Sequence, residues 1–246
     1  MRHREATYAE IVRVSRELLA SGSELSLRAV AAGMGVTAPA LYRYVSNYQE
    51  LVDLVAFEID KAVTDTYREA TERFPDDDPA AKLVVACVLF RNWGLQHRSE
   101  FGLVFANPVA ATSYSRRELM TQWCSGLFMN GLLVQAWRKY DFGYPTPEEL
   151  GPELVAILSD PLMPIDPADI PEGEPGLLWL FNSGWAALYG VVTLEVFGHL
   201  DPRVVESGAM FVQTIREWIR RLMPDEYDRL DALVVAELRQ ARSAQP

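Results

Sequence analysis

Apolar residues recur at intervals of three and four along most of the chain, which is the spacing of one helix face. No run of residues alternates between apolar and polar positions with the period of a β-strand. The pattern predicts an all-α fold. It places four helices within residues 1–73 and further helices at about 79–97, 98–106, 114–139, 148–159, 177–199, 203–223 and 225–242.

Local sequence signals mark the ends of the first helices. Thr7 followed by Glu10 has the pattern of a capping box, so we expect the first helix to begin there. Ser26 and Thr37 are expected to cap the second and third helices. Gly35 lies between them, and glycine adopts backbone angles that other residues reach only at a cost. The sequence therefore predicts an abrupt turn between the second and third helices.

The third helix is short and carries its apolar residues on one side. Ala38 and Pro39 fall in its first turn, where the missing N–H of proline has no helical partner to lose. Leu41 and Val45 are four residues apart and are expected to face inward. The fourth helix opens with one of two capping boxes, Ser46 with Gln49 or Asn47 with Glu50. This order of helices predicts a helix-turn-helix.

The remaining pattern indicates two domains. An N-terminal three-helix helix-turn-helix domain covers residues 1–50, and a larger all-helical domain covers residues 51–246. A helix over residues 47–73 connects them. Residues 141–176 are rich in Pro, Gly and Asp, so this stretch is expected to be a long surface loop with one short helix.

Charge is distributed unevenly between these parts. The whole chain has a formal net charge of −11, which by itself argues against binding to nucleic acid. Residues 1–50 hold six Lys and Arg residues against five Asp and Glu residues, which leaves this segment at +1 and the rest at −12. Only the first segment is therefore compatible with a phosphate surface.

The outer face of the third helix forms a candidate DNA-binding surface. In a helix-turn-helix this helix enters the major groove and contacts base edges. With Leu41 and Val45 turned inward, the outward positions are Ala38, Pro39, Ala40, Tyr42, Arg43 and Tyr44. Small side chains permit close approach, tyrosine hydroxyls bind phosphate oxygens, and Arg43 can contact guanine through two hydrogen bonds. Arg28 and Thr37 are expected to contact the DNA backbone.

These residues also carry a resemblance to a known family. The matching stretch runs from about Tyr8 to Leu54, and its core is Leu27–Ala31, Gly35–Val45 and Asn47. At these positions the chain resembles the tetracycline-repressor (TetR) family of one-component transcriptional regulators. The resemblance implies a repressor that binds a palindromic operator in double-stranded DNA as a homodimer. It also implies a helical C-terminal domain whose small-molecule effector releases the repressor from the operator.

One position departs from the family pattern. Family members often have a lysine after the asparagine, where it clamps the DNA backbone, and here that position is Tyr48. A neutral phenol can donate a hydrogen bond to phosphate, but it releases no counterion. We therefore add Tyr48 to the expected DNA contacts, with a weaker electrostatic contribution than lysine gives.

Past the fourth helix the resemblance is architectural. Residues 186–200 resemble the penultimate dimer helix of one TetR subclass. The helix at 203–223 would complete a four-helix bundle with a second copy through the apolar face formed by Phe211, Ile215, Trp218 and Leu222. We therefore expect a homodimer through helices at about 177–199 and 203–223, because so much apolar helix surface is not typical of a monomer.

Aromatic residues gather in the middle of the chain, where five of the six tryptophans lie between residues 93 and 185. Several of them share helical spacing with polar residues, and an apolar cavity with a few polar groups is what a small-molecule site requires. Taken singly, each residue could equally fill the core. The expected residues around a small apolar or aromatic effector are Trp93, His97, Phe101, Trp123, Leu127, Asn130, Asn182, Trp185 and Tyr189.

Metal, cofactor and catalytic sites find little support in the sequence. Cys87 and Cys124 lack the spacing of a metal site, and the three histidines are scattered. No phosphate-binding glycine loop or nucleophile elbow follows a strand. We therefore expect no metal, cofactor or catalytic residue. A helical enzyme acting on a small apolar substrate, or a DNA-binding regulator without a ligand, remain the alternatives.

One apolar segment raises the question of a membrane. Gly176–Leu194 contains no charged residue and is nearly long enough to cross a bilayer. Lysine and arginine are missing from its close flanks, and the N-terminus has no apolar signal segment. We therefore expect a cytoplasmic protein without a membrane partner, in which this segment is a helix buried on all sides.

Overall fold

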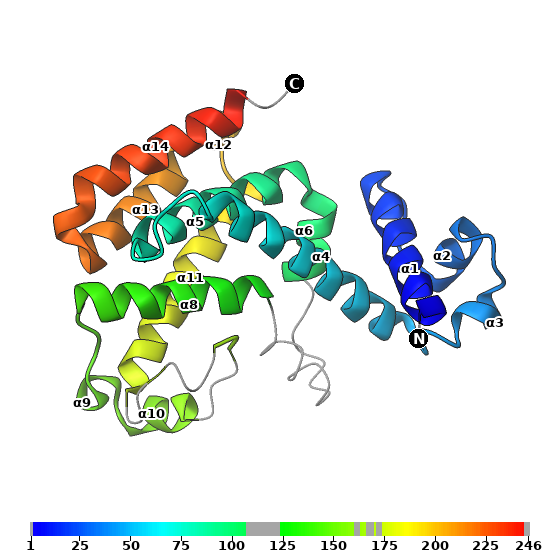
Figure 1. Ribbon diagram of the computed structural model, residues 1–246, viewed down its shortest axis with the longest axis horizontal. Helices are drawn as coiled ribbons and strands as arrows, with labels where there is room; N and C mark the ends of the chain where they lie inside the picture. Colours follow the sequence, from blue (N-terminus) through cyan, green and yellow to red (C-terminus); the bar gives the residue numbers. More distant parts are fainter. Residues whose placement is uncertain (1, 107–123, 160–162, 166–169, 171–173, 244–246) are drawn as a thin grey trace. The chain divides into compact units, whose positions relative to one another are not determined.

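A computed structural model describes residues 2–106, 124–159, 163–165, 170 and 174–243 (Figure 1). Within these residues the regular elements are helices and no strand is present, which confirms the expected all-α fold. The chain forms two compact units, which are described separately. One contains the described residues of 1–63 and 97–119, and the other contains those of 64–96 and 120–246. The expected boundary near residue 50 therefore differs from the division by contacts, because the connecting helix belongs partly to each unit.

The first unit is built on helices from the N-terminal part of the chain. These are α1 (Arg2–Ala20), α2 (Leu27–Gly33), α3 (Ala38–Leu41), α6 (Arg98–Phe105) and the part of α4 (Tyr48–Thr71) up to Val63. Helix α2 packs against both α1 and α3, and Figure 1 shows these three in blue. The core is apolar and fully enclosed, since Ile11, Val30, Leu41, Val45 and Leu51 are each at most 1% exposed. Leu41 and Val45 thus both face inward as expected, but α3 ends at Leu41, so Tyr42–Val45 follow the helix and are not part of it.

Three of the local signals act as expected. The Ser26 hydroxyl accepts a hydrogen bond from the Ala29 N–H at 3.1 Å and caps α2. Gly35 has a φ of +67°, the left-handed conformation that favours glycine. At the start of α4, the side-chain oxygen of Asn47 accepts a hydrogen bond from the Glu50 N–H at 3.0 Å. Asn47 therefore caps α4, but the Glu50 carboxylate accepts from the Ser46 N–H at 2.6 Å and not from the Asn47 N–H, so neither expected capping box is complete.

Two of the local signals were wrong. Helix α1 already begins at Arg2, so Thr7 lies within the helix and Glu10 pairs instead with Arg13. Thr37 precedes α3 but makes no side-chain capping bond. When residues before a capping pattern can also be helical, the pattern does not show whether the helix begins there or nearer the N-terminus. The tertiary contacts of α1 decide that.

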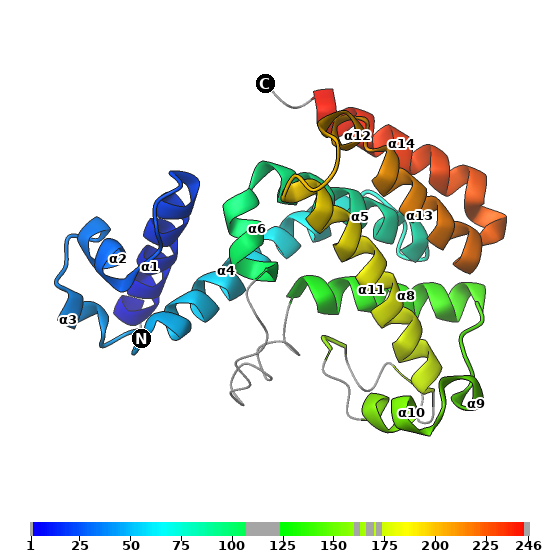
Figure 2. The same cartoon turned by 180° about the vertical axis from the view of Figure 1, so that it is seen from behind.

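The second unit is a bundle around α5. Helix α5 (Pro79–Gln96) packs against α8 (Cys124–Tyr140), α11 (Pro175–Val196) and α14 (Tyr227–Ser243), and α13 (Ala209–Leu222) packs between α11 and α14. Figures 1 and 2 both show α13 and α14 side by side and α11 crossing α8. Helix α5 is apolar on most sides because it is enclosed by its neighbours.

Short helices connect these long ones. The described part of residues 141–174 contains two short helices, α9 (Pro147–Leu150) and α10 (Pro152–Leu158), where one was expected. The predicted helix at 203–223 is two helices, α12 (Pro202–Ser207) and α13, separated by Gly208 with a φ of +65°. A single 3-10 turn, Pro224–Glu226, leads into α14. Helical spacing alone did not reveal these interruptions because each keeps the apolar period intact.

Helix α11 differs from the expectation that it is buried on all sides. One face is enclosed, but Trp179, Leu194 and Phe197 of the opposite side are 40%, 41% and 40% exposed. Among the described residues, Pro175–Val196 is the helix that has the length and composition of a membrane span. The helix is apolar throughout because one face packs in the core and the opposite face exposes further apolar side chains.

Candidate DNA-binding surface and ligand cavity

The first unit presents a surface of exposed and small side chains around α3. Tyr42 and Tyr48 are 51% and 52% exposed. Helix α3 has a proline in its first turn and small residues beside it, so its backbone is accessible to a flat or grooved partner. The other expected DNA contacts divide by exposure: Arg28, Thr37, Pro39 and Arg43 are exposed, and Ala38, Ala40 and Tyr44 are half-buried.

Tyr44 is held against α1 and does not face outward as its position suggested. Its ring meets the ring of Tyr8 edge to face, with 5.9 Å between centroids. The Tyr8 hydroxyl donates a hydrogen bond to the Tyr44 carbonyl at 3.3 Å, and Arg4 donates to the Tyr8 hydroxyl at 3.2 Å. The contact joins residues 36 positions apart, so sequence spacing gave no sign of it. Tyr44 therefore holds the segment that follows α3 against α1.

Two arginines on this surface are available for a negatively charged partner. Arg28 and Arg43 form no ion pair with any residue that the structure describes. By contrast, Arg13 on α1 is paired with both Glu10 and Glu17 at 2.6 and 2.5 Å. An arginine without an internal carboxylate keeps its donors for phosphate or a base edge.

An ion pair links α1 to α6 in the same unit. The guanidinium of Arg16 donates two hydrogen bonds to the carboxylate of Glu100, at 2.7 and 3.2 Å. Glu100 is 8% exposed and Arg16 is 39% exposed at their side chains. This bidentate contact fixes the geometry of α6 on α1 because both partners are planar groups. It was not anticipated, since the two residues are 84 positions apart.

The second unit contains an apolar cavity of about 100 Å³ between α5, α8, α11 and α13. Aliphatic and aromatic side chains dominate its lining, including Val84, Leu188 and Ile215. The side chains with polar atoms around it are those of Cys87, Asn130, Thr214, Trp185 and Trp218, and none of the lining residues is ionisable except the Cys87 thiol. Burial raises the pKa of that thiol to about 12, so Cys87 is neutral at physiological pH.

The structure brings two of the nine expected effector residues to this cavity. Asn130 and Trp185 line it. Asn182 instead lies in a groove between α10 and α11, where its amide donates to the Leu178 carbonyl at 3.0 Å. Trp93, Leu127 and Tyr189 of the second unit do not line the cavity, and Tyr189 is stacked on Trp185 at 5.3 Å.

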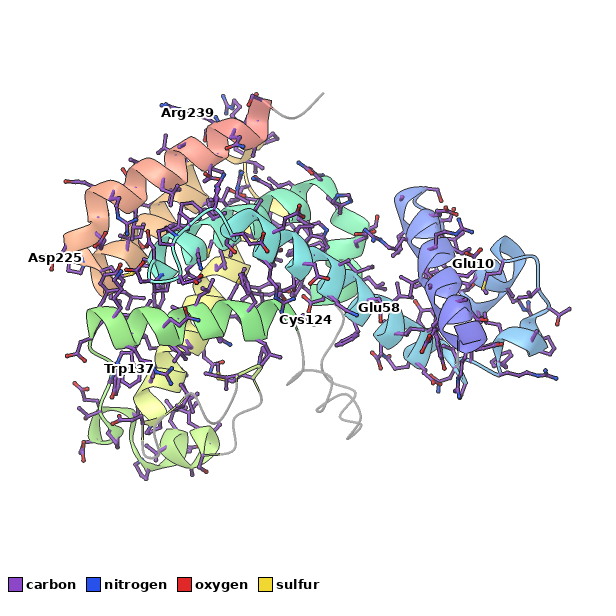
Figure 3. The ribbon with its side chains drawn as sticks, in the orientation of Figure 1. Glu10, Glu58, Cys124, Trp137, Asp225 and Arg239 are labelled. Carbon is purple, nitrogen blue, oxygen red and sulfur yellow. The ribbon has the colours of Figure 1, made fainter. Side chains whose placement is uncertain are left out.

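The remaining three expected residues lie elsewhere. His97 is exposed at the start of α6, and Phe101 is buried in the first unit, where its ring contacts Phe105 at 5.2 Å. Trp123 lies outside the described residues, immediately before Cys124, which Figure 3 labels at the first residue of α8. Shared helical spacing predicted a common face within each helix but not which neighbour that face meets.

Helix α13 contributes cavity residues that were assigned to another role. Ile215, Trp218 and Leu222 line the cavity, and Phe211 is fully buried in the same unit. The expectation that this face forms a bundle with a second copy was therefore wrong, because the chain uses it internally. The apolar period of α13 was visible in the sequence, but the partner of that face was not.

A buried ion pair lies one helical turn beyond the cavity along α5. Arg91 donates to the Glu195 carboxylate at 2.5 Å and to the Val205 carbonyl at 2.6 Å. Desolvation by burial raises the pKa of Glu195 above its ordinary value, and the charge of Arg91 opposes that shift. Both side chains are enclosed, and neither residue lines the cavity. A ligand in the cavity therefore does not contact this pair.

Comparison with known proteins agrees with this architecture. The family described as "Tetracyclin repressor-like, C-terminal domain" matches residues 83–218, more than half of the chain. The HTH-type transcriptional regulators Rv1816 of Mycobacterium tuberculosis and Mb1846 of Mycobacterium bovis are each 32% identical over 108 residues. That match covers 43% of this chain and 46% of each relative, so it spans less than half of their length. The chain therefore belongs to the tetracycline-repressor family.

Proposed function

We propose that the protein is a transcriptional repressor that binds a palindromic operator as a homodimer and is released by a small apolar or aromatic effector. The observation that carries this proposal is the helix-turn-helix surface of α2 and α3. There Tyr42 is 51% exposed beside small residues, and Arg43 has no described acidic partner. The family membership supports the same function. The cavity in the second unit supplies a place for the effector.

The surface of α3 suits the major groove of DNA. Pro39 and its neighbouring alanines keep the side chains short, so the helix can approach base edges closely. Arg43 is proposed to read one base pair, and Tyr42 and Tyr48 to donate hydrogen bonds to phosphates on either side. Two copies of this surface in a symmetric dimer would contact half-sites about one helical turn apart.

The exposed face of α11 supports the proposed dimer. Along α11 and its C-cap residue, a spacing of four, three, four and seven places Trp179, Ser183, Ala186, Gly190 and Phe197 on this face. The central members are small and let two helix backbones approach, whereas the outer members are large and 40% exposed. In a two-fold arrangement of antiparallel helices, Trp179 of one copy would meet Phe197 of the other.

The effect of effector binding is proposed to be transmitted to the DNA-binding surface through helices that connect the two units. Helix α5 lines the cavity and is followed, after His97, by α6, whose Glu100 pairs with Arg16 of α1. Helix α4 begins beside α3 and ends in the second unit, so a tilt of α4 is a second route. Typical coupling free energies of 1–3 kcal/mol, about 5- to 150-fold in affinity, would be sufficient for release.

A selection experiment tests the DNA-binding function. Full-length protein is mixed with fragments of genomic DNA at stated salt, and recovered duplexes are titrated by fluorescence anisotropy. We expect a recurrent inverted repeat. Arg43→Ala should change the preference at one base pair, and Tyr42→Phe should weaken binding to all sequences. Arg13→Ala is the matched control, because Arg13 is paired on the outer side of α1. Recovery of no sequence-specific duplex contradicts the proposal.

A further inference from the structure

The cavity of the second unit has features that define the chemistry of its ligand more closely than its apolar character alone. We infer that it binds a neutral single-ring aromatic compound with a hydroxyl group, that is, a phenol. This inference rests on the proposed function, since it names the effector class of the same site. It is carried by the hydrogen bonds of two lining residues, the orientation of one tryptophan and the absence of charge.

Thr214 presents an acceptor to the cavity. Its hydroxyl donates a hydrogen bond to the Met210 carbonyl, four residues earlier on α13, at 3.0 Å. A hydroxyl has one proton and two lone pairs, so the hydroxyl of this lining residue has only lone pairs left to offer. A ligand group that meets this oxygen must therefore donate a hydrogen bond to it.

Asn130 offers a second polar contact with fixed orientation. Its amide nitrogen donates to the Pro164 carbonyl at 2.8 Å, which uses one N–H and holds the side chain in place. The amide oxygen and the other N–H are the remaining groups. A hydroxyl can donate to one amide atom and accept from the other, whereas an ether can only accept and a methyl group can do neither.

Trp218 packs the six-membered part of its indole against Gly184, and both residues line the cavity. Its ring atoms Cζ3, Cη2 and Cε3 lie 3.6–3.8 Å from the position that a Cβ would take on Gly184, another lining residue. These atoms belong to the six-membered ring, on the side of the indole away from its N–H group. Gly184 leaves room for the indole ring, so α11 and Trp218 together form an aromatic, apolar wall against which a ligand ring can pack.

The size and charge of the site limit the ligand further. A cavity of about 100 Å³ is smaller than the ~150 Å³ of a cavity that holds benzene, so a single ring already requires some expansion and a larger ligand requires more. Met129 and Met223 line it, and their flexible side chains allow a modest expansion. No charged side chain lines it to pair with an ionised ligand, and burying an unpaired charge is strongly unfavourable.

A titration series tests each of these requirements. Full-length protein is titrated by calorimetry and by ligand-observed NMR with phenol, anisole, toluene, benzoate and benzylamine. We expect saturable binding of phenol and about three- to tenfold weaker binding of anisole and toluene, the effect of one neutral hydrogen bond. Benzoate and benzylamine are charged at pH 7 and should bind more than about 100-fold more weakly than phenol.

Two variants locate the phenol in this cavity. Thr214→Val keeps the side-chain shape but removes the acceptor, so the preference for phenol over toluene should fall by about threefold or more. Thr214→Ser restores a hydroxyl and should restore the preference. Thr71→Val is the matched control, because the Thr71 hydroxyl also donates to a carbonyl four residues earlier, at 2.8 Å, and does not line the cavity.

The outcomes separate this inference from the proposed function. Equal binding of anisole and phenol, tighter binding of a charged compound, or no saturable binding in the whole series overturns the phenol assignment. The same holds if Thr214→Val behaves as Thr71→Val does. None of these results affects the selection of an operator duplex, which tests the repressor function alone.

Discussion

Two arginine–glutamate pairs, one in each unit, have the same chemistry but opposite surroundings. Arg16–Glu100 in the first unit has side chains that are 39% and 8% exposed. Arg91–Glu195 in the second unit has side chains that are 5% and 0% exposed. Both join distant parts of the chain, 84 and 104 residues apart. Water therefore reaches the arginine of one pair and is excluded from the other.

The surroundings decide what each pair can do. Arg91 also bonds the Val205 carbonyl and lies 5.5 Å from the centre of the Phe211 ring, so it ties α5 to α11, α12 and α13. One carboxylate oxygen of Glu195 has no hydrogen-bond partner among the described residues. Separating these charges without water is unfavourable. Arg16, in contrast, can exchange its contact with Glu100 for water, so this contact can break at a lower cost than the buried pair.

The largest expected effect comes from breaking the buried pair. Arg91→Ala should lower the free energy of unfolding by about 3–5 kcal/mol, because Glu195 would be left as an unpaired buried charge. Urea unfolding followed by circular dichroism measures the change. The double variant Arg91→Met, Glu195→Leu is the control, and it should recover most of the loss because no charge remains buried. A loss below about 1 kcal/mol for Arg91→Ala would show that water enters this site.

The pKa of Glu195 predicts a smaller effect that depends on pH. Its folded-state pKa is raised, mainly by desolvation, so the folded state holds the proton at pH values where the unfolded chain has lost it. The contribution of Glu195 to stability is thus fullest at pH values below its unfolded pKa and declines as pH rises through the folded pKa. A tenfold difference in the acid dissociation constant between the folded and unfolded states corresponds to about 1.4 kcal/mol.

The comparison with Glu195→Gln isolates this effect. The unfolding free energy of the wild type minus that of the variant should decrease as pH is raised from about 4 toward neutrality. Urea unfolding at a series of pH values measures it. A difference that increases with pH would mean that the attraction of Arg91 outweighs desolvation, and that the pKa of Glu195 is lowered in the folded state.

Breaking the half-exposed pair is expected to change stability less and regulation more. Glu100→Gln should lower the unfolding free energy by about 1 kcal/mol, since Arg16 remains solvated. If α6 transmits the effector signal, operator affinity without effector should change by less than about threefold, whereas effector-induced release should be reduced. Anisotropy titrations with the selected duplex measure both. Full release in the variant would exclude this pair from the coupling route.

Salt gives the smallest effect and separates the two pairs directly. Raising ionic strength to about 1 M shortens the Debye length to about 3 Å and weakens interactions between charges that water reaches. The destabilisation caused by Glu100→Gln should therefore shrink in 1 M NaCl, by less than about 1 kcal/mol. That caused by Arg91→Ala should be nearly unchanged. Equal salt sensitivity of the two variants would contradict the difference in burial.

Signals that act within a few residues were read correctly for the most part. Ser26 and Asn47 cap their helices, and Leu41 and Val45 face inward, because each depends on neighbours in sequence. The apolar period of α13 was equally clear, but its face lines a cavity where an interface with a second copy was expected. A period defines an apolar face and leaves its partner open.

Contacts between distant residues explain why much of the candidate ligand site was not anticipated. Of the expected residues, Asn130 and Trp185 line the cavity, whereas Phe101 is buried in the other unit. Gly184 and Trp218 meet across two helices, which no spacing within one helix indicates. Aromatic residues are equally suitable for a core and for a cavity, so composition could not separate these two environments.

The sequence by itself determined the all-helical character, the helix-turn-helix and the small and exposed side chains of its surface, because periodicity, caps and turns are local properties. Only the tertiary structure decided which face of each long helix is enclosed, where the cavity lies and which charges are buried together. The physical reason is that burial depends on which helices pack against one another. Arg91 and Glu195 are ordinary charged residues in the sequence, and only packing turns them into a buried pair.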